Sequence, residues 1–304
     1  MRQHPVASVV VGCLFAVLLT GWAWSQPGPK PAAPPEIAKT IEDRTGVRGQ
    51  WNAAESVFRV AFARTDLPVK VAGNPLNGAN GLGVWAAFRL AGPTADVTGD
   101  LLLTEEQVNP VLGRALESGL EVTGLHNHFL WDEPRVMYMH FHGQGEIAAL
   151  ATAVGRVFAG VRDIDLRSPH PDWTVDPAQT TLKTEPIDAV LGVKGQMMAG
   201  VYKVTVGRKT TVEGRPMRNA MGVNTWMAFA GSDEQAVVDG DFAMLESEVQ
   251  PVLKALHRAG IDILALHNHM LGDTPRIVFL HFWGSGPATC LARGLKSALD
   301  VQAR

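Results

Sequence analysis

The chain is poor in the features that mark several common classes of protein. Its 304 residues include only two cysteines, so a framework of disulfides cannot hold it together. The 27 Lys and Arg residues are fewer than the 30 Asp and Glu residues, and the formal net charge is −3. No basic stripe is visible, which excludes nucleic acid as a partner. Only one long apolar run occurs, at the start, which excludes a protein with several membrane spans.

The composition is that of a folded protein. Hydrophobic residues make up 46% of the chain and charged residues 19%, so it can bury a core and is not disordered. The length suits one large domain or two domains of ordinary size.

Residues 1–25 have the pattern of a secretory signal peptide. Arg2 supplies the positive charge, residues 6–19 form the apolar region, and small side chains at Ala23 and Ser25 precede a cleavage position. We therefore predict an exported protein, periplasmic or extracellular, whose mature form has no transmembrane segment. A lipoprotein anchored at Cys13 is the alternative, which is disfavoured because the apolar run continues beyond this cysteine.

The sequence repeats itself on either side of a Pro-punctuated stretch. Trp85 matches Trp226 and His126-Asn127-His128 matches His267-Asn268-His269, all with one offset of 141 positions. We predict a Pro-rich spacer over 26–35, a first repeat domain over 36–160, a linker over 161–181 and a second repeat domain over 182–304. Such units are domain-sized, and we expect them to pack as a pseudo-dimer about an approximate two-fold axis.

Each repeat has the same order of predicted elements. A short helix precedes a turn at Gly46 or Gly192, and a β-rich segment follows over 57–63 or 201–206. Strands over 85–90 and 96–103 then precede a helix, two strands over 120–129 and 135–142, and a helix over 147–158. A β-rich part followed by αββα is typical of an α+β fold with a mainly antiparallel sheet. Cys290 falls in an apolar helical pattern, and we expect it to be buried.

Histidines concentrate in the windows 126–142 and 267–283, which hold seven of the ten. Residues two apart on a strand face the same side, so an antiparallel register with an even index sum places the histidines of each hairpin on one face. Met137, Met139 and Phe141 then face the core. The clustered histidines are His126, His128, His140 and His142 in the first repeat, and His267, His269 and His281 in the second, with Trp283 in the fourth position.

Clustered neutral imidazoles suit a divalent transition metal, of which zinc is the expected one. Asp132, Glu133 or Asp273 could add a carboxylate or orient an imidazole. Because Trp283 cannot bind a metal, we expect the first cluster to bind it more tightly. The competing interpretation is that the histidines are hydrogen-bonded strand residues packed against aromatic rings. Whether the two clusters form one site or two stays open.

Several motifs resemble those of one protein family. They are Gly-Val-Arg/Lys-Gly-Gln, Trp-x-Ala-Phe, Gly-Asp, His-Asn-His-x-Leu-x-x-x-Pro-Arg and His-Phe-x-Gly-x-Gly. Together they resemble the LppY/LpqO family, also called DUF1259, over nearly the whole mature chain. The resemblance implies an exported bacterial protein, in some members a lipoprotein, with a duplicated architecture. It implies no reaction.

Two classes of function remain open. The first is an envelope protein that binds a transition metal, with a zinc-dependent hydrolase as one form of it. The second is a non-catalytic module that binds a glycan, a peptide or a small molecule and uses its histidines structurally. The sequence leaves open whether the chain is an enzyme and what its oligomeric state is.

Overall fold

A computed structural model of the chain describes residues 34–302. The predicted signal peptide, Cys13 and most of the predicted spacer lie outside these residues. Within 34–302, no helix has the length and apolar character needed to cross a membrane.

Local sequence signals explain where the helices begin and end. The first helix starts at Pro35, whose fixed φ suits the first helical turn, and it ends where Gly46 adopts a φ of 66°. The matching helix of the second repeat ends at Gly192 with a φ of 74°. The side chain of Gln107 accepts a hydrogen bond from the N–H of Thr104 at 3.2 Å, just before the second helix.

The two repeats have closely matching elements. The first repeat contains α1 (Pro35–Thr45), β1 (Gly49–Asn52), β2 (Val57–Ala63), β3 (Lys70–Val71), β4 (Asn74–Pro75), β5 (Gly83–Ala91), β6 (Thr94–Thr104), α2 (Val108–Glu117), β7 (Glu121–His126), β8 (Asp132–Glu133), β9 (Val136–Glu146) and α3 (Ile147–Arg162). The second repeat contains α4 (Thr184–Leu191), β10 (Gln196–Met198), β11 (Val201–Gly207), β12 (Thr210–Val212), β13 (Arg215–Met217), β14 (Asn224–Gly231), β15 (Ala236–Leu245), α5 (Val249–Arg258), β16 (Asp262–His267), β17 (Asp273–Thr274), β18 (Ile277–Gly286) and α6 (Ala288–Asp300).

The long strands form one sheet of twelve strands. Their order is β1-β2-β5-β6-β9-β7-β16-β18-β15-β14-β11-β10. Read inward from its own edge, each repeat therefore has the equivalent strands in the same order, and β7 and β16 meet at the centre. The strands pair antiparallel throughout. The predicted α+β class with two tandem units is therefore confirmed.

Reciprocal contacts at the centre of the sheet reveal the symmetry of the two halves. Leu125 pairs with its own equivalent, Leu266. The side chain of Asn109 accepts a hydrogen bond from the N–H of Ile263 at 2.7 Å and donates one to its carbonyl at 3.2 Å. Gln250 makes the same two bonds with Val122, at 3.1 and 2.7 Å. Contacts that repeat with the partners exchanged define a two-fold relation, as the pseudo-dimer prediction requires.

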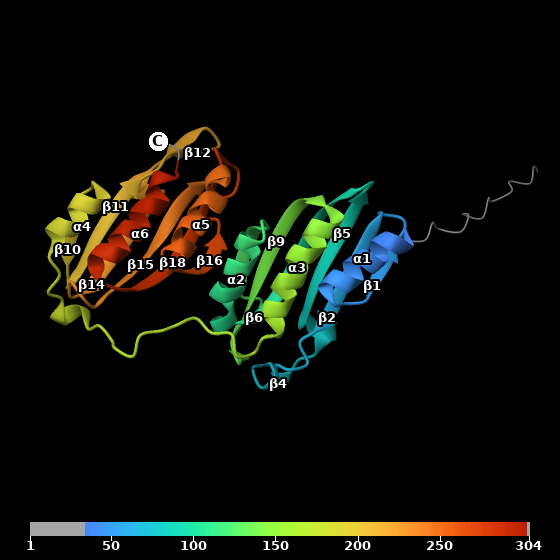
Figure 1. The fold of residues 1–304 in the computed structure, drawn as a ribbon. Helices are drawn as coiled ribbons and strands as arrows, with labels where there is room; N and C mark the ends of the chain where they lie inside the picture. Colours follow the sequence, from blue (N-terminus) through green and yellow to red (C-terminus); the bar gives the residue numbers. More distant parts are fainter. Residues whose placement is uncertain (1–33, 303–304) are drawn as a thin grey trace, which may run out of the picture. The chain divides into compact units, whose positions relative to one another are not determined.

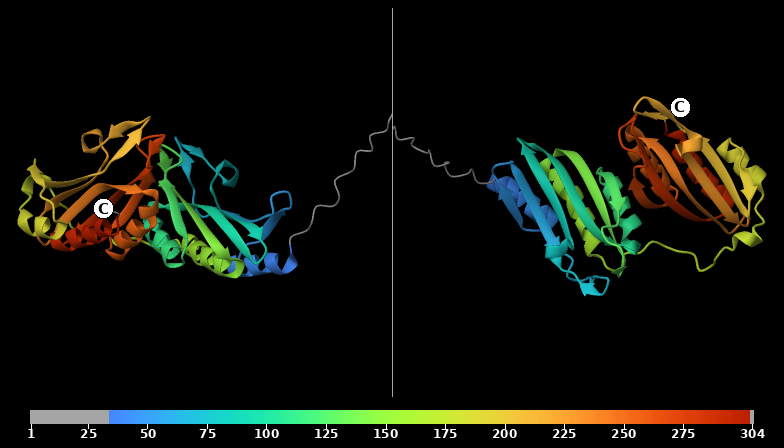
Figure 2. Two further views of the ribbon diagram at one scale, coloured as in Figure 1. Left: turned by 90° about the horizontal axis from the view of Figure 1, so that it is seen from above. Right: turned by 180° about the vertical axis from the view of Figure 1, so that it is seen from behind.

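The helices cover one face of the sheet, and short β-hairpins stand on the other (Figures 1 and 2). Buried residues such as Val154, Phe141 and Leu295 form the core between the helices and the sheet. Two three-stranded sheets lie outside this layer, with the orders β4-β3-β8 and β13-β12-β17. The face without helices, called the open face below, carries the clustered histidines.

The structure corrects the prediction for Cys290, which is exposed on α6. This helix buries Leu291, Ala292 and Leu295, which lie on the side that packs on the sheet. Two boundaries also shift. The helix α3 continues to Arg162, and β7 ends at His126, so His128 lies in a loop rather than on a strand.

Candidate functional site

A row of directly paired residues crosses the open face of each half of the sheet. In the first repeat, Trp85 on β5 lies opposite Asp100 on β6, which lies opposite His140 on β9. Side chains of directly opposed residues have Cβ atoms about 4.5–5.5 Å apart. The pairing therefore brings a carboxylate beside an imidazole. The same row in the second repeat consists of Trp226, Asp241 and His281.

A glycine precedes the aspartate in both rows because an aromatic ring occupies the other face of the strand. A Cβ atom on Gly99 would lie 2.3 Å from the ring of Phe141, and one on Gly240 would lie 2.4 Å from the ring of Phe282. Only glycine leaves room for these rings. The aspartate that follows then points to the open face, since successive side chains alternate.

The end of β7 supplies the other histidines of the first cluster. His126 lies opposite Tyr138, so the register has the even index sum that the sequence predicts. His128 follows in the loop, and its ring stacks on that of Tyr138 with the centroids 3.3 Å apart. In the second repeat, His269 stacks in the same way on Phe279, at 3.4 Å. An aromatic floor thus orients the second histidine of each His-Asn-His motif.

These placements create two separate groups of possible metal ligands. In each group the ligand atoms of three side chains all lie within 4.8 Å of one another. The ring centroid of His126 lies 5.1 Å from that of His128 and 5.0 Å from that of His140. The first group is His126, His128 and His140, and the second is Asp241, His267 and His269.

A fourth side chain adjoins each group. The Nδ1 atom of His140 lies 3.7 Å from Oδ1 of Asp100 in the first repeat. In the second repeat the ring of His281 stacks on that of His267, with the centroids 4.7 Å apart. His269 Nε2 lies 3.3 Å from Oδ2 of Asp241. Each repeat therefore assembles three histidines and one aspartate.

Other predicted ligands have different surroundings. His142 lies two residues beyond His140 on β9, opposite Thr98 on one neighbouring strand and Glu121 on the other. It does not join the ligand group found among residues 34–302. Without it, the number of histidines no longer favours the first cluster. Glu133 is exposed. The carboxylate of Asp132 accepts a hydrogen bond from the N–H of Val136 at 2.8 Å, and that of Asp273 accepts one from Ile277 at 2.6 Å, so both brace their loops.

Sequence reasoning missed Asp100 and Asp241 as members of the site. Both belong to the Gly-Asp pair that repeats with the same offset as the histidines. In the sequence this pair indicates the duplication only. That its aspartates lie opposite His140 and His281 depends on which strands are neighbours in the sheet. A repeated acidic residue on a strand with mainly apolar neighbours is the signal that could have found them.

Burial favours the neutral form of three imidazoles, those of His126, His128 and His267. It lowers the pKa values of His126 and His128, and the neighbouring His140 lowers both further. Burial also lowers the pKa of His267 to about 4, with smaller contributions from His281 and His269. The carboxyl group of Asp241 has a raised pKa for the same reason, burial. Neutral imidazole is the form that binds a metal.

Two buried polar atoms in or beside these groups lack a hydrogen bond to any residue that the structure describes. Of the buried side-chain nitrogen and oxygen atoms in residues 34–302, Asp100 Oδ1 and His267 Nδ1 lack a hydrogen bond. A buried polar atom left without a partner costs about 1–3 kcal/mol. A cation bound at His267 Nδ1 would satisfy that nitrogen, and Asp100 Oδ1 can accept a hydrogen bond from His140, whose Nδ1 atom lies 3.7 Å away. Two nitrogens bound to one zinc ion at about 2.1 Å lie at most about 4.2 Å apart, so the groups need only small side-chain rotations to hold it.

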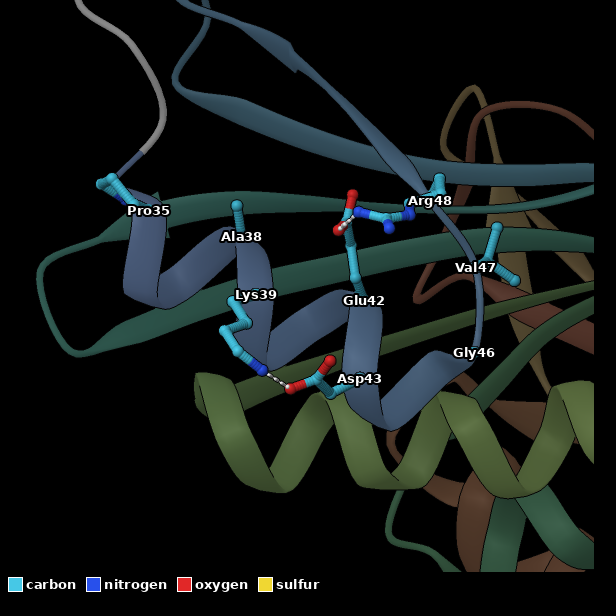
Figure 3. Close-up of a pocket in the computed structure, with 8 residues that line it drawn as sticks. All are labelled: Pro35, Ala38, Lys39, Glu42, Asp43, Gly46, Val47 and Arg48. Carbon is cyan, nitrogen blue, oxygen red and sulfur yellow. Dashed lines mark hydrogen bonds and ion pairs between the residues drawn. The ribbon is translucent and has the colours of Figure 1, made fainter.

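A hollow beside α1 shows what a surface without convergent ligands looks like (Figure 3). It has a volume of about 460 Å³, and its charged side chains pair with one another. Arg48 lies 3.1 Å from the carboxylate of Glu42, and Lys39 pairs with Asp43. The Glu42 carboxylate also accepts a hydrogen bond from the N–H of Gly49. The charges of this hollow are already satisfied, in contrast to the clusters.

The comparisons with known proteins bear on the same two regions. The family model described as "Domain of Unknown Function (DUF1259)" matches residues 39–159 and 185–301. The chain belongs to the DUF1259 family. Each copy of the DUF1259 domain contains one of the two groups of possible ligands. Searches of curated proteins and of solved structures found no match.

Proposed function

We propose that this DUF1259 protein binds a divalent transition metal, zinc above all, at one centre in each repeat. The first centre is held by His126, His128 and His140, and the second by Asp241, His267 and His269. The observation that carries the proposal is the convergence of three possible ligand atoms within 4.8 Å of one another in each repeat. Each group also has a buried polar atom in or beside it that lacks a hydrogen bond, His267 Nδ1 in the second and Asp100 Oδ1 beside the first. Imidazole and carboxylate are ligands that zinc accepts.

The chemistry of each centre follows from its ligands. A zinc ion held by three protein side chains keeps a position for water or a ligand and acts as a Lewis acid when bound. Asp100 lies beside His140 and can orient that imidazole by accepting a hydrogen bond from it. The aromatic floor under His128 and His269 restricts the rotation of these rings and so favours one geometry.

The proposal is tested by the metal content of the full chain purified without a His-tag or nickel resin. Elemental analysis should find two zinc ions per chain. The variant His126→Ala/His128→Ala should retain one, and the variant His267→Ala/His269→Ala should also retain one. His170→Ala is the control, because this histidine lies outside both clusters. Absence of bound metal from the unmutated chain at neutral pH overturns the proposal, and loss of both ions from either double variant indicates one shared site.

We also propose that the chain is exported after removal of residues 1–25. The arginine, apolar run and small residues of that segment support the proposal. N-terminal sequencing of the protein recovered from the producing cell should give a terminus at Gln26. A soluble protein that retains Met1 would contradict export, and a lipidated Cys13 would identify a lipoprotein.

A further inference from the structure

A cavity adjoins the first cluster on the side away from the centre of the sheet. Its volume is about 440 Å³, within the range of about 300–1,000 Å³ that is typical of small-molecule sites. Asp100 and His128 line one side of it, and Arg59 and Trp85 line another. A molecule in this cavity would therefore contact the metal centre and a cation at once.

Small residues keep this cavity open. Ala61 lies opposite Trp85, and Ala63 lies opposite Gly83, and all four line the cavity. The second repeat has larger side chains at two of the matching positions, Thr205 for Ala61 and Asn224 for Gly83, and only Gly207, which matches Ala63, is smaller. Thr205 lies opposite Trp226, and Asn224 lies opposite Gly207. The two repeats thus share the metal ligands but differ in the space beside them.

Arg59 lines the cavity, and its guanidinium group can pair with a bound anion. Its guanidinium carbon lies 4.4 Å from the centroid of the Trp85 ring, which positions the group by a cation–π contact. No carboxylate among residues 34–302 forms an ion pair with it. The second repeat places Lys203 over Trp226 in the same way, at 4.1 Å. A cation held on a tryptophan beside the cluster is therefore a feature of both halves.

We propose that this cavity binds a small molecule with a carboxylate or phosphate group. The oxyanion pairs with the guanidinium of Arg59, which offers two parallel N–H donors to such a group. Another oxygen atom of the same molecule occupies the open position of the metal at His126, His128 and His140. This inference rests on the proposed metal centre. It assigns the second repeat a metal centre with less space for a ligand.

The test uses the full chain loaded with Co²⁺, whose visible absorption changes when an oxygen ligand joins the metal. Inorganic phosphate and acetate are titrated in separate arms, with chloride as the control, and calorimetry measures the affinity. The unmutated chain should bind one of the two anions and change its spectrum. Tighter binding in one arm names the oxyanion.

Two variants probe the two features of the cavity. Arg59→Gln removes the charge from an exposed side chain and should weaken binding about tenfold or more, because the oxyanion loses its hydrogen bonds to a charged group. Ala61→Thr introduces the side chain that the second repeat has at this position and should block entry while the charge remains. Lys203→Gln is the matched control and should leave the affinity unchanged. All three variants should retain Co²⁺.

Metal content and anion affinity are measured separately, so the two proposals can fail separately. The inference is overturned if neither anion binds, or if Arg59→Gln binds the anion as tightly as the unmutated chain. A chain that takes up no Co²⁺ contradicts the proposed function alone. In that metal-free chain, phosphate or acetate binding that depends on Arg59 would still support the oxyanion site, and its absence would overturn it.

Discussion

At the scale of single residues, burial of His267 makes the stability of the chain depend on pH. Its pKa of about 4 in the folded chain lies below the value of about 6.5 expected when the chain is unfolded. Between these values the unfolded chain binds a proton that the folded chain does not. The free energy of unfolding of the metal-free protein should therefore fall as the pH drops from 6.5 to 4.

This dependence can be assigned to one side chain. His267→Asn should make the free energy of unfolding less sensitive to pH in this range, as measured by chemical denaturation with a chelator present. His170→Asn, in the exposed linker, should leave the dependence as it is. An identical pH dependence for His267→Asn and the unmutated chain would show that His267 is not the group responsible.

Asp241 is the second residue whose role can be isolated. Asp241→Asn keeps an oxygen that can accept the hydrogen bond from Leu280 but removes the negative charge from the ligand group. We expect the zinc affinity of the second centre to fall about 10–100-fold, which competition with a chelator measures. Asp239→Asn is the control, since Asp239 faces the same side two residues earlier and lies outside the group. Equal affinities in the two variants would remove Asp241 from the centre.

At the scale of elements, the sequence predicts the histidine hairpin well and its neighbours poorly. Alternation along the strand is a local property, so the shared face of His126 and His140 follows from counting. Which strand lies on the far side of β9 is not a local property. Asp100 joins the site through β6, which the chain reaches long before the hairpin. The register shift between Val122 and Gly124 also depends on three-dimensional packing.

The glycine before each aspartate gives a test at this scale. Gly240→Ala places a Cβ atom 2.4 Å from the ring of Phe282 and 2.1 Å from the carbonyl oxygen of Trp226. We expect it to lower the free energy of unfolding by about 1–3 kcal/mol, because a packed core resists added volume. Gly83→Ala is the matched strand control, since its Cβ atom has no neighbour closer than 3.7 Å. Equal stabilities of the two variants would show that β15 can move away from the ring.

At the scale of the whole molecule, the duplication is visible in the sequence but the continuous sheet is not. The offset of 141 predicts two alike units and, with them, a two-fold relation. That the units join through β7 and β16 depends on two strand edges that only the folded halves present. The reciprocal bonds of Asn109 and Gln250 stabilise this junction.

Because these two side chains are equivalent, they should contribute alike. Asn109→Ala leaves the N–H and carbonyl of Ile263 without their partner, and Gln250→Ala does the same for Val122. Each should lower the free energy of unfolding by about 1–3 kcal/mol, measured by denaturant titration. A clear difference between the two variants would contradict the symmetric junction.

The junction also brings the two groups of possible ligands to one surface. Leu125 opposes Leu266, and both are buried on the helix side. The next residues, His126 and His267, therefore face the open side as diagonal neighbours, whose Cα atoms lie about 7–8 Å apart in such a pair. The ligand groups nevertheless stay separate. The chain should therefore hold two metal ions, one on each side of the junction between β7 and β16.

Anomalous scattering at the zinc edge from crystals of the untagged full chain tests this account most directly. The account predicts two peaks, one among His126, His128 and His140 and one among Asp241, His267 and His269. Both peaks should lie on the open face. Crystals grown with zinc at neutral pH that show no peak at either group, or zinc only at other surface residues, would contradict it.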